Sequence, residues 1–340
     1  MPSAKRTTRI EVARAAGVSE YTVSVVLNDP WYGRVGAETR ERVRSIAAAL
    51  GYRPQASGRA LRLGRTELIA YVSTPELLHH VGSYHGALLP ALLSAANDAG
   101  YELAIVGDDR EEALLQRLRR AVQSGRFDGL ILGQPHLDDP VLDLLRHAGL
   151  PFVLAAEHPH GSLCQVVRDG YAMAADVAAR LVAAGHRRVG LAGADPAWRR
   201  QWFNQRRRQG LQGTLAPQGE LIDLPVDLAE GIRQARRAGV TAIVAGTDAD
   251  AVQIVGAALA AGLAVPRDLS VVSLYAVCAP AATAPGAPSL ASLCVEPSDV
   301  AREAVRALAT LVAGEALHAS RITLPYWWTA GQSLAPPPIR

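Results

Sequence analysis

From Glu67 onward, short apolar runs alternate with longer amphipathic segments, and this alternation limits the fold more than any other feature of the sequence. Runs with strand character lie at 68–72, 102–106, 129–133, 152–155, 188–192, 241–245, 270–274 and 322–324. Candidate helices between them include 110–124, 170–184 and 248–261. Such alternation is typical of βαβ units, in which helices cover both faces of a parallel sheet. Since eight strands are more than one such sheet usually holds, we expect an α/β core of two doubly wound lobes.

The first 52 residues follow a different pattern, that of short helices with clear start signals. Thr8 and Glu11 have the spacing of a capping box, which predicts a helix over 9–16. Ser19 is a favourable N-cap for a second helix over 20–27. Two short helices joined by a three-residue turn that contains glycine form a helix-turn-helix. The sequence therefore predicts an all-α head, for which a small helical bundle without a ligand is the alternative interpretation.

A third helix and a linker complete this N-terminal region. The third helix is expected over 37–50, where Val43, Ile46, Ala47 and Leu50 form one apolar stripe before Gly51. Residues 53–65 then contain four arginines, two glycines and a proline. A short helix is possible over 55–63, although Gly58 in its middle costs about 1 kcal/mol relative to alanine. We expect this segment to become ordered only with a partner.

Charge is distributed unevenly along the chain, although the net charge is only +3. The first 65 residues carry twelve Lys and Arg against five Asp and Glu, whereas the remaining 275 carry twenty-three against twenty-seven. A basic head on a mildly acidic body is typical of a protein whose head meets a polyanion. This distribution favours double-stranded DNA as the partner of the helix-turn-helix.

The composition and the termini indicate a soluble, cytoplasmic protein that does not enter a membrane. Cys164, Cys278 and Cys294 are odd in number and far apart, which fits a reducing compartment and no disulfide framework. The N-terminus has no apolar stretch of the kind found in secretory signals. The longest apolar segment, 251–266, is shorter than a membrane-spanning helix requires.

No sequence motif indicates catalysis, a cofactor or a metal ion. The dinucleotide-binding, phosphate-binding-loop, serine-nucleophile and zinc-protease patterns are absent, so a two-lobed metabolic enzyme is disfavoured. His79-His80 and His158-Pro159-His160 lack the further ligands that a metal site needs. A periplasmic ligand carrier would explain the core but neither the basic head nor the missing signal segment.

Several strings of the head and linker match one family closely. They are Val12-Ala13-Arg14-Ala15-Ala16-Gly17-Val18-Ser19, Thr22-Val23-Ser24, Leu27-Asn28, Glu38-Thr39-Arg40-Glu41-Arg42-Val43, Leu50-Gly51-Tyr52-Arg53-Pro54 and Arg59-Ala60-Leu61-Arg62. Weaker matches in the core include Gly185-His186-Arg187-Arg188-Val189 and Val265-Pro266-Arg267-Asp268-Leu269-Ser270-Val271-Val272. On these residues the chain resembles the lactose-repressor (LacI/GalR) family of bacterial transcription regulators.

The resemblance implies a domain organisation and a mode of action. Residues 1–52 would be the helix-turn-helix DNA-binding domain and 53–65 the hinge helix. Residues 66–340 would be an effector-binding and dimerisation core like a periplasmic binding protein. Its N-lobe would comprise about 66–163 and 293–325, and its C-lobe about 164–292. The family acts as homodimers on near-palindromic operators, so we expect a non-enzymatic regulator, by default a repressor.

The resemblance also places the DNA contacts. Glu20, Tyr21 and Val25 would occupy base-reading positions, with Thr22 and Ser24 on phosphates. Where this chain has Val25 the family commonly has an arginine, which reads guanine, so we expect an operator that lacks this contact. Leu61 would be the apolar wedge that the hinge helix inserts into the minor groove. The further expected DNA contacts are Ser19, Asn28, Arg59 and Arg62.

The resemblance also assigns effector contacts, one residue at a time. The expected ligand contacts are Tyr84, His85, Trp202, Arg207, Asp248 and Tyr275. Arg207 matches the family's effector-binding arginine, although Arg206 and Arg208 beside it also fit a solvated helix face. Asp248 matches a family aspartate, or else it caps the helix that begins there. Trp198, Trp202 and Phe203 either stack on a ligand or belong to the core, and Trp327-Trp328 fits packing.

Tyr275 stands where the family usually has an aspartate that binds sugar hydroxyls. Tyrosine cannot supply a carboxylate, which argues against an ordinary sugar effector. The resemblance still implies a regulator whose affinity for DNA responds to a sugar or related metabolite bound between the lobes. The alternative is a degenerate pocket that responds to a non-sugar ligand or to none.

Overall fold

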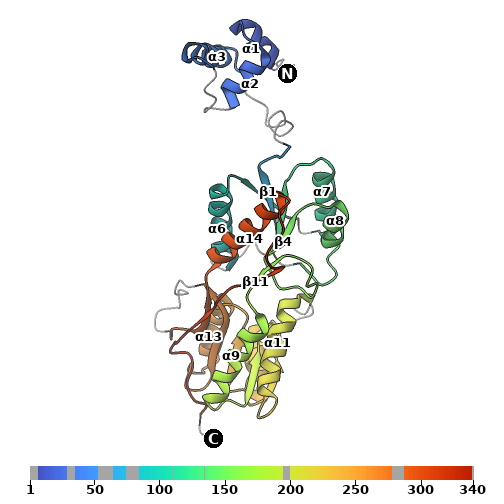
Figure 1. Ribbon diagram of the computed structural model, residues 1–340. Helices are drawn as coiled ribbons and strands as arrows, with labels where there is room; N and C mark the ends of the chain where they lie inside the picture. The colour runs from blue at the N-terminus through green and yellow to red at the C-terminus, as the bar shows by residue number, and fades with distance from the viewer. Residues whose placement is uncertain are drawn as a thin grey trace. The chain divides into compact units, whose positions relative to one another are not determined.

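The computed structural model describes residues 7–28, 35–52, 64–73, 84–108, 110–133, 135–193, 200–277 and 287–338. The chain divides into two compact units, Met1–Glu67 and Leu68–Arg340 (Figure 1). The first unit is the helical head and the second is the α/β core. The helix expected over 55–63 lies outside the described residues.

The head contains the three predicted helices, α1 (Arg9–Ala16), α2 (Glu20–Asn28) and α3 (Ala37–Ala49). The capping box at α1 is present, since Thr8 Oγ1 accepts from Glu11 N at 3.4 Å and Thr8 N donates to Glu11 Oε2 at 2.7 Å. Ser19 Oγ accepts from Thr22 N at 3.1 Å and so caps α2. Gly17 adopts a φ of 65°, a left-handed conformation that glycine takes without strain. These local signals fix the turn between α1 and α2.

The head has its own small apolar core. Val43 and Ala47 of the expected α3 stripe are buried in it, and Ile46 packs at its edge. Leu50 is 41% exposed, because the helix ends before it and Leu50 serves as the C-cap. The other buried members are Val12, Ala13, Ala16, Val23 and Val26.

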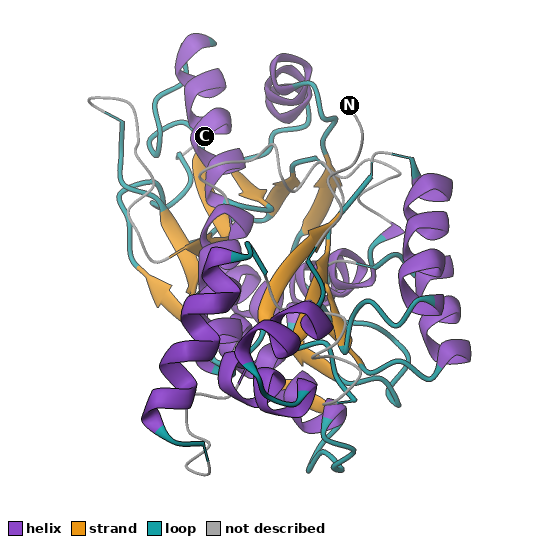
Figure 2. Cartoon of the chain, turned by 90° about the horizontal axis from the view of Figure 1, so that it is seen from above, coloured by secondary structure: helices purple, strands orange, loops and turns teal. Residues whose placement is uncertain are grey.

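The first sheet of the core has the strand order β11-β5-β4-β3-β1-β2, and its pairs are parallel. Side chains alternate across it, so Ile69 and Tyr71 face α6 and α14 while Ala70 and Val72 face α7 and α8. Both faces are therefore covered by helices, as predicted (Figure 2). Its elements are β1 (Leu68–Val72), α6 (Tyr84–Asp98), β2 (Glu102–Val106), α7 (Glu111–Gln123), β3 (Gly129–Leu132), α8 (Pro140–Ala148), β4 (Phe152–Leu154), β5 (Gln165–Val167), α14 (Pro297–Val312) and β11 (Arg321–Thr323).

The second sheet has the order β12-β10-β9-β8-β6-β7. Helices α9 and α11 pack on one face of it, and α12 and α13 on the other. Its pairs are parallel except β10 with β12, which is antiparallel. Its elements are α9 (Gly170–Ala183), β6 (Arg188–Leu191), α11 (Trp202–Leu215), β7 (Glu220–Asp223), α12 (Leu228–Arg237), β8 (Ala242–Ala245), α13 (Asp248–Ala260), β9 (Ser270–Val277), β10 (Ala291–Val295) and β12 (Trp327–Thr329).

The chain passes between the two sheets three times, after β5, after β10 and after β11. The strands at these crossings differ from the sequence expectation. Residues 164–292 were expected in the C-lobe, but β5, which falls within them, pairs in the first sheet. Residues 293–325 were expected in the N-lobe, but β10, which includes the first of them, lies in the second sheet. Short apolar segments beside a crossing do not reveal from sequence which sheet they join.

Two further observations complete the fold. Trp328 packs against the core of the second sheet, with the guanidinium of Arg180 4.5 Å from its ring centroid, whereas Trp327 is 44% exposed. The expected packing role therefore holds for Trp328 alone. Within the described part of the chain, every helix is too short or too polar to cross a membrane.

Candidate DNA-reading helix and candidate effector site

The start of helix α2 carries Glu20, Tyr21, Thr22 and Ser24, four of the expected DNA contacts. Tyr21 is 65% exposed, which leaves its ring accessible on the surface of the head. Glu20 lies beside it and pairs with Arg9 of α1, with Arg9 Nε donating to Glu20 Oε2 at 3.0 Å. Thr22 bonds to the Ser19 hydroxyl at 2.9 Å. The start of α2 thus combines an accessible aromatic ring with polar groups held by local hydrogen bonds.

Val25 departs from the sequence expectation. It is 4% exposed, so in this structure its side chain does not lie on the accessible outer face of α2. The apolar run Val23-Val25-Val26 places valine on more than one side of this short helix, and the sequence pattern did not identify the buried side. The side chain of Asn28 lies outside the described residues, as do Arg59, Leu61 and Arg62.

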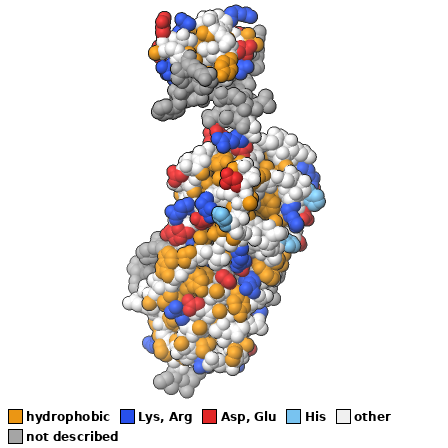
Figure 3. Space-filling view, viewed as in Figure 1, with side chains coloured by type: hydrophobic (Ala, Val, Ile, Leu, Met, Phe, Trp, Pro, Cys, Tyr) orange, Lys and Arg blue, Asp and Glu red, His pale blue; other side chains and the backbone are white. Residues whose placement is uncertain are grey.

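The described surface of the head also carries arginines that could approach a polyanion. Arg14 of α1 and Arg42 and Arg44 of α3 are exposed. Figure 3 shows Lys and Arg side chains on the visible face of the head, beside acidic ones. Exposed guanidinium groups bind phosphate oxygens with little cost in desolvation.

In the core, residues from both lobes converge around Arg207. Tyr84 begins α6 on the first sheet, Tyr275 lies on β9 of the second sheet, and Phe203 and Arg207 lie on α11. The rings of Tyr84 and Tyr275 pack edge to face with centroids 4.8 Å apart. The Arg207 guanidinium lies 5.0 Å from the Phe203 ring and 5.1 Å from the Tyr275 ring. We call Tyr84, Phe203, Arg207 and Tyr275 the effector cluster.

Arg207 is buried rather than solvated, which resolves the alternative left open by its charged neighbours. It is 9% exposed, and its Nη1 donates to Asn204 Oδ1 at 3.3 Å. Burial lowers the pKa of Arg207 from its ordinary value. Arg206 and Arg208 point to other partners, since Arg208 pairs with Asp223 at 3.0 Å. The family position thus coincides with a buried cation at the junction of the lobes.

Arg168 is a second buried guanidinium that the sequence analysis missed. It is 7% exposed, and its three hydrogen bonds reach Pro325 O at 3.1 Å, Glu296 O at 2.7 Å and the Tyr275 hydroxyl at 3.3 Å. Arg168 directly follows β5, at the carboxyl end of a parallel strand, where ligand sites form. This position could have identified Arg168 from the sequence only if the strand β5 had been predicted.

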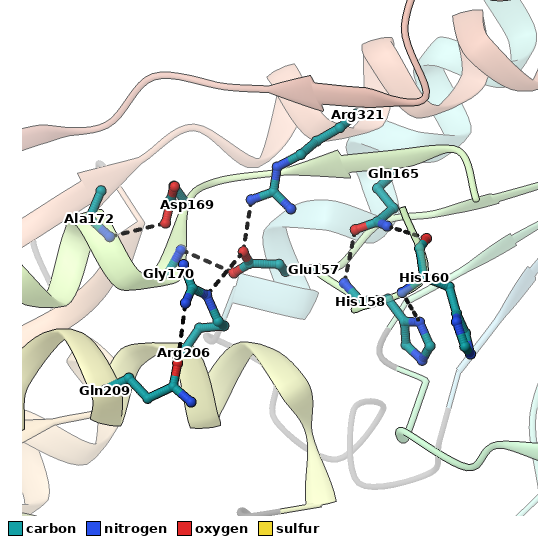
Figure 4. A network of polar contacts seen from close by, with 10 residues as sticks. All are labelled: Glu157, His158, His160, Gln165, Asp169, Gly170, Ala172, Arg206, Gln209 and Arg321. Atoms are coloured by element: carbon teal, nitrogen blue, oxygen red, sulfur yellow. Dashed lines mark hydrogen bonds and ion pairs between the residues drawn. The ribbon is translucent and has the colours of Figure 1, made fainter. Parts of the chain in front are cut away.

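Glu157 forms a polar network beside the cluster, which the sequence analysis also missed (Figure 4). Arg321 Nη2 donates to Glu157 Oε1 at 2.7 Å, Gly170 N donates to Oε2 at 3.2 Å, and Arg206 Nε lies 3.8 Å from Oε1. The network joins a loop after β4 to β11, α9 and α11. The carboxylate is 3% exposed, and the positive N-terminal end of α9 helps to stabilise its charge.

The other three expected effector contacts are Asp248, Trp202 and His85, and none of them is part of the effector cluster. Beside Asp248, Thr247 caps α13, since its hydroxyl oxygen accepts from Asp250 N at 3.2 Å. Asp248 is therefore not the cap; it is buried in the first turn and accepts from Ala249 N at 2.9 Å. Trp202 begins α11 and is half-buried. The side chain of His85 lies outside the described residues, as does Trp198.

The histidines of this region do not form a metal centre in the described part of the chain. His158 and His160 lie with ring centroids 5.0 Å apart, and both main chains bond to Gln165. Burial lowers the pKa of His158, and the charge of His160 lowers it further. His158 is buried and His160 is exposed, so only His158 packs in the interior.

Comparisons with known proteins agree with this architecture. Residues 10–55 match the family model "Bacterial regulatory proteins, lacI family", and residues 178–334 match "Periplasmic binding protein-like domain". The HTH-type transcriptional regulator RafR of Escherichia coli is 31% identical over 237 residues, which cover 68% of this chain and 67% of RafR. The ribose operon repressor of Escherichia coli (strain K12) is 26% identical over 273 residues, which cover 77% of this chain and 81% of the repressor.

Solved structures show the same fold. A Lac repressor dimer bound to operator and the anti-inducer ONPF aligns with a TM-score of 0.78 at 23% identity, over 97% of this chain and 100% of that chain. A complex of the transcriptional regulator CelR with cellobiose aligns with a TM-score of 0.67 at 24% identity, over 96% and 100%. These relatives are transcriptional regulators, not enzymes. With a helix-turn-helix head on a two-sheet core, the chain belongs to the lacI family of DNA-binding transcriptional regulators.

Proposed function

We propose that the protein is a cytoplasmic, dimeric repressor whose affinity for a near-palindromic operator changes when a small molecule binds at the effector cluster. Residues 1–52 would bind DNA, 53–65 would form the hinge helix, and 66–340 would bind the effector and dimerise. The observation that carries the proposal is the burial of Arg207 against Tyr275, beside Tyr84 of the other lobe. A ligand bound there contacts both lobes at once.

The coupling follows from this position. A ligand shifts a conformational equilibrium only if it binds one lobe arrangement better than the other. Groups from α6, α11 and β9 meet at the effector cluster, so the contacts of a bound ligand depend on how closely the lobes approach. Operator and effector then alter each other's affinity by the same factor.

Dimerisation is supported by apolar side chains on the surface of the core. Leu93 on α6 and Ile105 on β2 are 49% and 51% exposed, on elements that pack beside each other. A two-fold dimer uses the same patch of both subunits and presents two heads to two half-sites. We expect Leu93→Ser to lower the affinity of the dimer. Sedimentation of this variant and of the unchanged protein measures the difference.

Operator reading is assigned to the start of α2. We expect Tyr21→Ala to weaken specific operator binding, whereas Val226→Ala, which truncates a side chain 57% exposed in the core, leaves it unchanged. Because Val25 is buried, no side chain at that position reads guanine. Selection of binding sites from a random DNA library checks this. Strong enrichment of a half-site that requires guanine there would contradict the assignment.

The decisive experiment is a gel-shift measurement on DNA upstream of the protein's own gene, with and without candidate sugars, sugar acids and nucleosides. We expect specific, salt-dependent binding that an active ligand alters. Failure of the folded dimer to bind any DNA specifically would overturn the proposal. Specific DNA binding that no ligand alters would instead favour the alternative, a regulator with a degenerate pocket.

A further inference from the structure

The effector cluster contains a buried positive charge whose hydrogen-bonding capacity is largely unused. A guanidinium has five N–H donors. In the described part of the chain Arg207 makes one hydrogen bond, to Asn204, and its Nε is buried without any partner. No carboxylate of the described residues lies within ion-pair distance of it. A buried charge is costly unless it is paired and hydrogen-bonded.

Two aromatic rings flank this cation. The Arg207 guanidinium lies over Phe203 and Tyr275, and Tyr84 packs edge to face on Tyr275. Ring faces stabilise a guanidinium less than an anionic hydrogen-bond partner does. They also offer flat surfaces on which the carbon skeleton of a small molecule packs. The surroundings therefore retain the cation without neutralising it.

Arg168 adds a second buried cation in contact with Tyr275. Its partners are two backbone carbonyls and the Tyr275 hydroxyl, all of them uncharged. Tyr275 thus contacts both guanidinium groups, one through its hydroxyl and the other through its ring face. A carboxylate at position 275 would have balanced this charge, and tyrosine does not.

The nearby carboxylates already have partners. Glu157 is bound by Arg321, Arg206 and the N–H of Gly170 (Figure 4). Asp169 caps α9 by accepting from Ala172 N at 3.0 Å, and Asp248 accepts from Ala249 N. None of the three lies within ion-pair distance of Arg207 or Arg168, and the charge of Glu157 acts on Arg207 only from farther away.

We propose that the effector carries an anionic group, a carboxylate or a phosphate, that binds Arg207 while its carbon skeleton packs on Phe203 and Tyr275. The inference rests on the proposed function, because it takes the effector cluster to be the regulatory ligand site. The class of ligand is then an acidic or phosphorylated metabolite rather than a neutral sugar. The anion supplies the counter-charge of Arg207 and accepts a hydrogen bond from its unpartnered Nε–H.

The test compares matched ligands that differ only in charge. Glucose, gluconate and glucose 6-phosphate, and galactose with galacturonate, are titrated into the full-length protein by calorimetry, with inorganic phosphate and acetate as anion probes. We expect at least one acidic probe to bind at least about tenfold more tightly than its neutral partner. The carboxylate and phosphate arms distinguish the two sources of the anion. Equal affinity within each pair, or no binding of any anionic probe at 10 mM, would overturn the proposal.

Two variants locate the site. Arg207→Gln keeps a polar side chain but removes the charge, and we expect it to lose at least about tenfold in affinity for the anionic probe. Arg208→Gln is the matched control, since Arg208 is the next residue of α11 and pairs with Asp223. Tyr275→Asp places a carboxylate beside Arg207 and Arg168, which should abolish anion binding. Unchanged anion affinity in Arg207→Gln or Tyr275→Asp would contradict the assignment, and circular dichroism verifies that each variant is folded.

The same samples separate this inference from the proposed function. Gel-shift titrations with operator DNA are run in parallel with calorimetry. Anion binding that requires Arg207 but does not change DNA affinity would support the ligand class and contradict the regulatory role. A neutral sugar that changes DNA affinity, with no anion bound, would support regulation and contradict the ligand class.

Discussion

The helix caps of the head and the polar contacts around the effector cluster differ greatly in sequence separation. In the head, Thr8 with Glu11 and Ser19 with Thr22 are three residues apart. In the core, Arg168 bonds Tyr275 across 107 residues, and Arg321 bonds Glu157 across 164. Changes in the head should therefore act locally, whereas changes beside the effector cluster should act on both lobes, since each lobe supplies part of the contact. Four predictions test this contrast, beginning with the largest effect.

Removing the charge of Glu157 should have the largest effect. In Glu157→Gln, Arg321 and Arg206 lose their shared carboxylate, and Gly170 N loses a charged acceptor. Breaking a buried ion pair costs about 3–5 kcal/mol, and we expect the low end because Arg321 and Arg206 are partly exposed. Urea unfolding of the core measures the loss.

Glu220→Gln is the matched control for this prediction. Glu220 pairs with Arg188 at 3.8 Å, and both side chains are more than half exposed. Such a pair contributes about 0–1 kcal/mol, so we expect little change in the free energy of unfolding. Equal losses in the two variants would show that the Glu157 network does not join the lobes.

Acid should weaken the core more than the head. All nine histidines follow residue 67, and burial lowers the pKa of His186 and His158. A histidine with a lowered pKa in the folded state favours folding above its ordinary pKa of about 6.5, and this contribution is lost as the pH falls below that value. Each histidine then reduces the free energy of unfolding by at most about 1.4 kcal/mol per pH unit.

Unfolding of the core followed between pH 7 and pH 5 checks this expectation. His186 bonds Thr241 Oγ1 at 2.8 Å and Ala335 O at 2.9 Å. His186→Asn should make the pH dependence shallower, whereas His318→Asn, at an exposed position, should not. A slope that is the same in both variants and the unchanged protein would exclude His186 as a cause.

The same contrast explains what the sequence could predict. The helices of the head were predicted within one residue, because caps and turns depend on neighbours in sequence. Eight strands of the core were predicted, but β5, β7, β10 and β12 were missed. These strands are short or lie beside crossings, and their pairing partners are distant in sequence. Tertiary contacts decide such segments, not local propensity.

The candidate site divides in the same way. Tyr84, Arg207 and Tyr275 were predicted from the family resemblance, and the structure brings them together. Arg168 and Glu157 were missed because only the packed lobes place them beside these residues. Val25 was misplaced because neighbouring valines give a short helix no single apolar face.

Loss of the α1 cap should have an intermediate effect, confined to the head. Thr8→Ala removes the acceptor of Glu11 N and should cost about 1 kcal/mol. Hydrogen exchange of head peptides should quicken by about fivefold, while core peptides are unchanged. Asp227→Ala removes a similar cap from α12, where Asp227 accepts from Glu230 N at 2.7 Å, and should quicken exchange in the core alone. Changes in both units from either variant would refute the local character of the head.

The smallest effect on stability is expected at the surface pair of the head. Arg9 and Glu20 are 48% and 43% exposed, so Glu20→Gln should change the free energy of unfolding by less than about 0.5 kcal/mol. Its effect on DNA binding should be larger, because it removes a negative charge from the helix that we propose to read the operator, and it releases Arg9. One additional phosphate contact by Arg9 would steepen the dependence of log affinity on log salt concentration by about 0.9. Glu230→Gln is the matched control, since Glu230 is also 43% exposed and pairs with Arg233 at 2.7 Å in the core. Salt titrations of DNA binding should distinguish the two variants. An equal salt dependence in both would show that the face of α2 bearing Glu20 does not approach the phosphates.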